Sequence, residues 1–170
     1  LLKTSDSGFK KAILAHVLDE AGMTVFQVSA RYWFEWNLYN ALKNNEYLDG
    51  QTISKYWVAG RDKIYGNSID FFDELIWEWT MKPHYFRVGF RFYNYPYVYA
   101  QLFVYALYQV YKKEGKKFVP KYKKLLAAGG SVSPKELAKS VGLDITKKDF
   151  WKLGIKQYED FVNELEKLTD

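Results

Sequence analysis

The chain has 170 residues, of which 48% are hydrophobic, with a formal net charge of +5 and no cysteine. This length can bury one core but not two ordinary domains, so we expect a single helical unit over residues 1–170. The lack of cysteine excludes disulfides, thiolate zinc sites and cysteine nucleophiles, and it favours a cytoplasmic location. The sequence contains neither an apolar run of about 18 residues nor a basic segment followed by an apolar one, so we expect no membrane partner.

Apolar residues in the first half recur at the three- and four-residue spacing of helices. This pattern predicts one long helix over residues 9–42, with a bend near Gly22. Turn residues at 49–52 lead into a second helix whose apolar stripe ends near Gly66. A short helix is expected to follow over residues 69–79.

The second half begins with a break at Pro83, because the residue before a proline avoids helical geometry. The alternation over residues 86–92 resembles a strand but is too short to build a sheet. Helices are predicted over residues 97–113, with Pro96 suited to the first turn, and over residues 119–128.

Two capping boxes predict the starts of the last helices. Ser133 is followed three residues later by Glu136, and Thr146 is followed three residues later by Asp149. With these helices added, the fold class is predicted to be all-α, a multi-helix bundle.

Lysines cluster at helical spacing in the second half, at 112–113, 116–117 and 121–124. Acidic residues are interspersed elsewhere and no nucleic-acid motif accompanies the clusters, so a solvated helix face is favoured over nucleic-acid binding. A nucleic-acid-binding protein would instead show a steep salt dependence of its affinity.

The two histidines do not belong to a His-Glu-x-x-His zinc motif, so we expect no metal ligand within this chain. His16 fits a position on a helix face or between helices. Asp70, Asp73 and Glu74 lie close in sequence, but acids early in a short helix commonly serve the helix dipole.

His84 lies in a predicted loop among tyrosines that include Tyr93, Tyr97 and Tyr99. Such a group could donate hydrogen bonds to an oxyanion that develops during acyl transfer. It could equally form an aromatic corner that packs against neighbouring helices. The residues alone leave both interpretations open.

Several blocks in order along the chain resemble the oligoendopeptidase F group of the thimet oligopeptidase-like (M3) zinc metallopeptidases. They are Thr24-Val25-Phe26-Gln27 with Phe34-Glu35, Pro83-His84-Tyr85-Phe86 with Phe92-Tyr93-Asn94-Tyr95-Pro96-Tyr97-Val98-Tyr99-Ala100-Gln101, Leu126-Ala127-Ala128-Gly129-Gly130-Ser131 with Pro134 and Glu136-Leu137, and Leu143-Asp144-Ile145. The interval between His84 and the tyrosines is longer than in the bacterial members.

The resemblance implies a clam-like, all-helical oligopeptidase whose channel admits short peptides. Zinc would be held by a motif and a glutamate upstream of Leu1, so this C-terminal fragment would bind no zinc and would be inactive alone. His84 and Tyr99 would take part in catalysis by stabilising the oxyanion. His84, Tyr93, Tyr97 and Tyr99 would bind the substrate.

The expected partners are short peptide substrates and the upstream segment of the same protein, and an exposed apolar face could also support a homodimer. The alternative function is a non-catalytic helical module that binds a peptide or a protein in an aromatic cleft. A gene start near Leu1 would favour that alternative.

Overall fold

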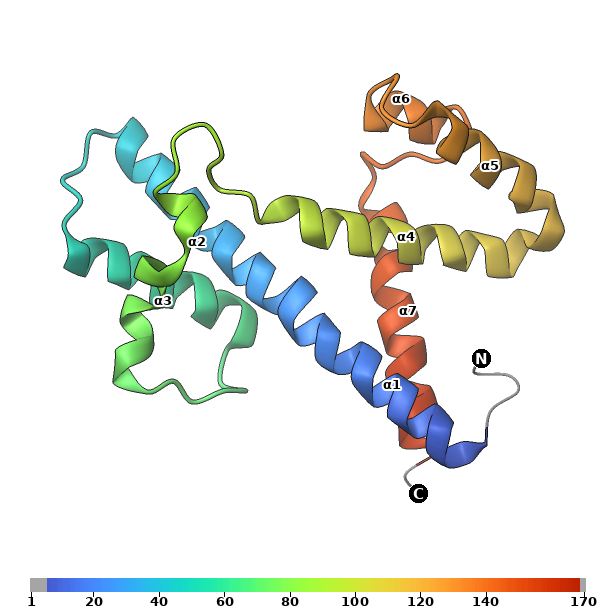
Figure 1. Cartoon of the computed structure of the whole chain (residues 1–170), viewed down its shortest axis with the longest axis horizontal. Helices are drawn as coiled ribbons and strands as arrows, with labels where there is room; N and C mark the ends of the chain where they lie inside the picture. The colour runs from blue at the N-terminus through green and yellow to red at the C-terminus, as the bar shows by residue number, and fades with distance from the viewer. Residues whose placement is uncertain (1–5, 169–170) are drawn as a thin grey trace. The chain divides into compact units, whose positions relative to one another are not determined.

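The computed structural model describes residues 6–168. All regular structure in this range is helical, with no strand, which confirms the predicted all-α class (Figure 1). The backbone divides into two compact units. The terminal unit joins the start of the chain, up to Leu18, to the part from Ala100 onward, and the central unit comprises Asp19–Tyr99.

Helical segments follow one another along most of the described range. They are α1 (Ser7–Ala21), the π-helical segment η1 (Gly22–Gln27), α2 (Val28–Lys43), α3 (Gly50–Tyr65), the 3₁₀ helices η2 (Asp73–Met81) and η3 (Pro83–Tyr85), α4 (Tyr95–Glu114), the 3₁₀ segment η4 (Gly115–Phe118), α5 (Val119–Ala128), α6 (Pro134–Lys139) and α7 (Lys148–Glu166). In residues 6–168, no helix is both long and apolar enough to cross a membrane.

The long helix predicted for residues 9–42 changes its hydrogen-bonding pattern at the glycine where a bend was expected. Gly22 begins η1, whose wider turns separate α1 from α2. The second predicted helix is confirmed as α3. The Asp49 side chain accepts a hydrogen bond from the Thr52 N–H at 2.8 Å, and Gly66 ends the helix with a φ of 53°.

A glycine lets α2 and α3 approach each other closely in the central unit. A Cβ added at Gly60 would lie 2.6 Å from the carbonyl oxygen of Ala30 and 2.8 Å from the amide nitrogen of Phe34. Beside this contact, the buried rings of Phe34 and Trp57 pack edge to face with centroids 5.1 Å apart. The crossing therefore combines backbone contact with an aromatic core.

The short helix predicted for residues 69–79 is displaced along the chain and has a different geometry. Residues 69–72 are not helical, and η2 is a 3₁₀ helix held by bonds such as Leu75 N–H to the Phe72 carbonyl oxygen at 3.0 Å. Asp73 and Glu74 occupy its first turn, as the dipole interpretation predicted. The indole of Trp79 donates to Ser54 Oγ at 2.9 Å and attaches η2 to α3.

The terminal unit has an apolar core between α4, α5 and the loop after α6. Its buried members are Leu107, Phe118, Leu125 and Val141. Helix α7 approaches α4 through Gly154, because a Cβ there would lie 2.5 Å from the carbonyl oxygen of Leu102.

Of the two predicted capping boxes, one is confirmed and one is wrong. Ser133 and Glu136 exchange their hydrogen bonds at the start of α6. Thr146 instead donates from its N–H and hydroxyl to Asp144 Oδ1, at 3.0 and 2.6 Å, and α7 starts at Lys148. The local turn at Asp144 takes the threonine away from the helix end, a competition that short polar side chains commonly enter.

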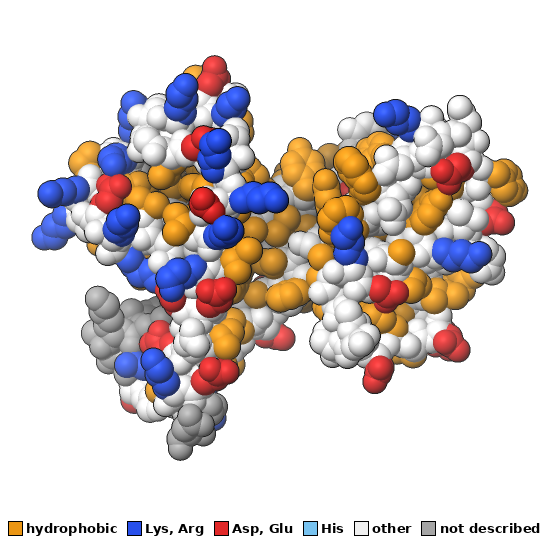
Figure 2. Space-filling view, turned by 180° about the vertical axis from the view of Figure 1, so that it is seen from behind, with side chains coloured by type: hydrophobic (Ala, Val, Ile, Leu, Met, Phe, Trp, Pro, Cys, Tyr) orange, Lys and Arg blue, Asp and Glu red, His pale blue; other side chains and the backbone are white. Residues whose placement is uncertain are grey.

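Large apolar side chains are exposed on both units (Figure 2). Met81 and Val88 of the central unit are 75% and 88% exposed, and Leu126 of the terminal unit is 64% exposed.

Candidate functional site

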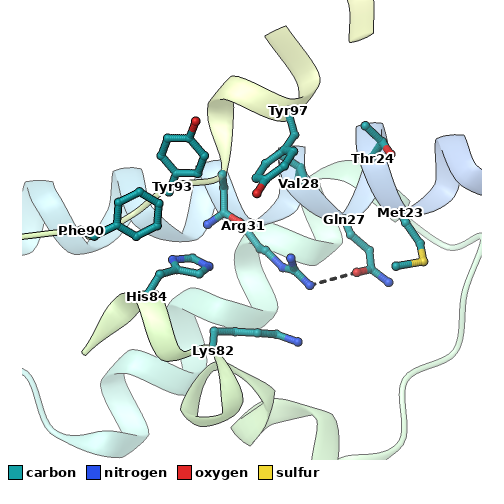
Figure 3. A pocket seen from close by; sticks show the side chains of 11 residues that line it. Met23, Thr24, Gln27, Val28, Arg31, Lys82, His84, Phe90, Tyr93 and Tyr97 are labelled. Atoms are coloured by element: carbon teal, nitrogen blue, oxygen red, sulfur yellow. Dashed lines mark hydrogen bonds between the residues drawn. The ribbon is translucent and has the colours of Figure 1, made fainter. Parts of the chain in front are cut away.

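A pocket of about 390 Å³ lies in the central unit (Figure 3). Its walls come from two parts of the chain, η1 with the start of α2, and the segment from Lys82 to Tyr97. The lining residues are Met23, Thr24, Gln27, Val28, Arg31, Lys82, His84, Phe90, Tyr93, Asn94 and Tyr97. The pocket is therefore aromatic and basic, and it has no acidic residue in its lining.

One wall of the pocket is formed by side chains on a single helix face. Thr24, Gln27, Val28 and Arg31 follow the i, i+3, i+4, i+7 spacing, although the helix passes from π to α geometry between them. The guanidinium Nη2 of Arg31 donates to Gln27 Oε1 at 3.0 Å, which orients both polar groups.

The opposite wall contains three of the four residues predicted to form the site. His84 lies in η3, which Pro83 begins, and Tyr93 and Tyr97 flank the start of α4. The rings of Tyr93 and Tyr97 meet edge to face with centroids 5.7 Å apart. Tyr99 is not among the lining residues, and burial raises the pKa of its phenol.

The surroundings of the His84 imidazole favour its neutral form. Burial lowers its pKa, and the positive charges of Arg31, Lys82 and Arg87 lower it further. Its Nδ1 atom is buried and has no hydrogen-bond partner among the described residues. The ring therefore has an unused polar atom in the pocket wall. By contrast, His16 is exposed on α1, as expected of a helix-face residue.

A polar cluster of buried Glu35, buried Asn94 and half-buried Tyr85 lies beside the pocket. Asn94 Nδ2 donates to Glu35 Oε1 and to the phenol oxygen of Tyr85, the latter at 3.3 Å, and Glu35 is also hydrogen-bonded to Tyr85. Burial raises the pKa of Glu35 from 4.5 to about 7. Burial together with Glu35 raises the pKa of Tyr85. The cluster joins α2 to the pocket loop.

The second cation of the pocket has a partner of its own. Lys82 Nζ lies 2.7 Å from Glu78, which also accepts from Arg61 at 2.6 Å. Two cations thus share one carboxylate. The positive charge beside the pocket is only partly neutralised.

The described residues do not form a metal site. Across residues 6–168, no group of three or more histidine, cysteine, aspartate or glutamate side chains could hold an ion. The chemistry available in this pocket is hydrogen bonding, cationic attraction and aromatic contact.

Sequence reasoning missed the cationic part of the site. Arg31 and Gln27 stand four residues apart on a helix, a spacing visible in the sequence, but nothing local showed that this face meets residues 82–97. Glu35 belongs to one of the blocks that resemble the oligoendopeptidases, yet its bond to Asn94, 59 residues later, could not be inferred.

The model of peptidase family M3 matches residues 2–156. The chain belongs to peptidase family M3. Within this family it is 28% identical over 156 residues to oligopeptidase PepF of Bacillus subtilis (strain 168), covering 92% of this chain and 23% of that protein. It is 29% identical over 174 residues to the plasmid-encoded oligoendopeptidase F of Lactococcus lactis subsp. cremoris, covering 100% of this chain and 28% of that protein.

This M3 chain also resembles a crystal structure of a candidate peptidase from Chlamydophila abortus. The TM-score is 0.87 at 26% identity, over 98% of this chain and 28% of that one. The M3 chain spans about a quarter of the length of the relatives it matches. The predicted resemblance to oligoendopeptidase F is confirmed.

Proposed function

We propose that this chain is the C-terminal part of an M3 catalytic domain that hydrolyses short peptides, and that its pocket forms one wall of the substrate channel. In this role His84 and Tyr99 stabilise the oxyanion of the reaction, while His84, Tyr93, Tyr97 and Tyr99 contact the peptide. The observation that carries the proposal is the convergence of His84, Tyr93 and Tyr97 on one pocket in a chain of this family.

The geometry supports a binding role for His84, Tyr93 and Tyr97, which line the pocket. A wide aromatic pocket with a few polar groups suits a peptide, because the rings contact side chains and the polar atoms fix the backbone. His84 lines the pocket, and its neutral ring carries one N–H that can donate a hydrogen bond. Donation to a developing oxyanion is among the largest single contributions to acyl transfer.

In the proposed enzyme, zinc is a cofactor that is bound outside the described residues of this chain. The described residues do not fit a zinc site, so in the proposed enzyme the ion and its ligands come from an upstream segment. The exposed apolar side chains of both units suit coverage by that segment. A homodimer through this surface is the competing outcome, which sedimentation of the 170-residue chain would detect.

The proposal is tested on the longest native protein that contains this chain. Quenched fluorescent peptides of roughly eight residues should be hydrolysed, a zinc chelator should abolish hydrolysis, and added zinc should restore it. The 170-residue chain by itself should bind the peptides without cleaving them. Peptide binding without hydrolysis by the native protein would favour the alternative, a non-catalytic peptide-binding module.

A further inference from the structure

Arg31 is a cation in the pocket without an anionic partner. Its one hydrogen bond is to the neutral amide of Gln27, and it forms no ion pair with any of the described residues. A guanidinium group has five N–H donors in a fixed planar arrangement. Most of these donors remain available to a ligand.

The surroundings of Arg31 favour an anion. Figure 3 shows the side chain extending from the helix toward the wall that carries His84 and Lys82. The lining includes no acidic residue. Glu35, a buried carboxyl on the same helix, is hydrogen-bonded to Asn94 and forms no ion pair with Arg31, and burial raises its pKa, so it offsets the guanidinium charge only in part.

The aromatic residues determine what kind of anion fits. Phe90 and Tyr93 pack with centroids 4.7 Å apart, and Phe90, Tyr93 and Tyr97 are each about half exposed at the pocket. These rings offer apolar contact next to the cation. A free inorganic anion would leave them unused, whereas a peptide presents a carboxylate and neighbouring side chains together.

We infer that the pocket selects peptides that carry a carboxylate, and that Arg31 is the residue that recognises it. The inference rests on the proposed function, because it assumes that the pocket holds peptides. The carboxylate accepts paired hydrogen bonds from the guanidinium, the geometry in which arginine binds carboxylates most strongly. His84 lines the same pocket, where its neutral ring carries one N–H that can donate a further bond.

The carboxylate has two sources, the peptide C-terminus or an acidic side chain, and matched peptides distinguish them. The first pair is acetyl-Phe-Ala-Phe with a free carboxylate or with an amide at its end. The second pair, both amidated, is acetyl-Phe-Glu-Phe and acetyl-Phe-Gln-Phe. Calorimetry with the 170-residue chain at neutral pH measures the four affinities.

The charged member of one pair should bind about 10-fold more tightly than its neutral counterpart, the scale of one charge-assisted hydrogen-bond pair. The peptide pair that shows this difference in affinity identifies whether the carboxylate is the peptide C-terminus or an acidic side chain. In Arg31→Gln the difference should fall below about 2-fold while the neutral peptide keeps its affinity. Arg31→Lys should retain part of the preference, because it keeps the charge but loses the planar donor pair.

Arg91→Gln is the matched control, since Arg91 belongs to the central unit, is exposed and does not line the pocket. It should leave the preference unchanged. Circular dichroism establishes that each variant is folded, and the comparison of peptides on the unaltered chain requires no variant at all.

Equal binding of the charged and neutral members of both pairs would overturn the inference and leave peptide binding intact. A preference that persists in Arg31→Gln would overturn the role of Arg31. If none of the four peptides bound, the proposed function and the inference would fall together.

Discussion

The two units of the chain differ in the polar groups that they hold beside their apolar cores. In the terminal unit the main core is apolar, and its charged residues pair near the surface, as Asp160 does with Lys112 at 2.6 Å and Lys156 at 2.8 Å. In the central unit a buried carboxyl and a buried amide lie with a half-buried phenol beside a cationic pocket. Apolar burial stabilises a fold directly, whereas a buried carboxyl costs free energy unless it is hydrogen-bonded.

The contrast places the perturbed titratable groups beside the candidate pocket. The central unit keeps an unpaired guanidinium, a neutral histidine and a carboxyl with a raised pKa within one region. Perturbed titratable groups of this kind concentrate at functional sites. The terminal unit has no comparable group in its main core cluster, so we assign it mainly a structural role.

The largest effect is expected from the core of the terminal unit. Phe118 is 2% exposed, and Phe118→Ala should lower the free energy of unfolding by about 3–5 kcal/mol. Tyr122→Ala, at a half-exposed neighbouring ring, should cost much less. Denaturant titration measures both losses. If folded Phe118→Ala bound peptides much more weakly than the unaltered chain, the structural role of this unit would be contradicted.

The next effect is on catalysis by the longer native protein. Tyr99→Phe removes only a phenol oxygen from the central unit and should lower kcat by about 10²-fold, the loss expected for one oxyanion donor. Tyr122→Phe in the terminal unit should leave kcat unchanged. Steady-state hydrolysis of a short peptide gives both values. An unchanged kcat in Tyr99→Phe would reduce this tyrosine to a packing role.

A smaller effect concerns the helix crossing of the central unit. Gly60→Ala should destabilise the chain by about 2 kcal/mol, because the new methyl group meets the backbone of α2. Gly130→Ala is the control, since nothing lies within 4 Å of its added Cβ. Alanine normally improves a helix, so thermal unfolding of Gly60→Ala at a higher temperature would disprove the close approach.

Local sequence signals predicted most of the helix ends. The capping box at Ser133 and the glycines that follow α3 and α5 were each visible in a few residues. The capping box predicted at Thr146 is wrong because the Thr146 hydroxyl donates to Asp144, two residues earlier. The spacing rule for capping boxes does not consider such a competing acceptor. The helix predicted for residues 69–79 is instead the 3₁₀ helix η2, because the spacing of apolar residues does not distinguish 3₁₀ from α geometry.

The residues of the site also divide into those that local sequence predicted and those that it missed. His84, Tyr93 and Tyr97 lie within one short segment and were predicted together. Arg31 and Glu35 come from a helix more than 45 residues earlier, and only tertiary packing brings them to that segment. Local sequence can predict one wall of such a pocket, but the partner wall requires the fold.

The remaining effect is a difference in pH dependence between the units, which is a slope and not a loss at a single pH. Because burial raises the pKa of Glu35 from 4.5 to about 7, the folded chain binds more protons than the unfolded chain in this window. This group should therefore make stability fall as pH rises from 4.5 to 7, by at most about 1.4 kcal/mol per pH unit for one proton. Asp160 should act oppositely, because hydrogen bonds from Lys112 and Lys156 lower its pKa. Its contribution is present above the unfolded pKa of 3.8 and is lost in more acidic solution.

Two isosteric variants separate these contributions. Glu35→Gln removes the ionisation but keeps an oxygen that can accept from Asn94, so it should flatten the fall in stability between pH 4.5 and 7. Asp160→Asn should leave that fall in place and reduce the loss of stability below pH 4. Urea unfolding at a series of pH values measures both profiles. A slope between pH 4.5 and 7 that persisted in Glu35→Gln would mean that the buried carboxyl is already charged, and the contrast between the two units would lose its electrostatic basis.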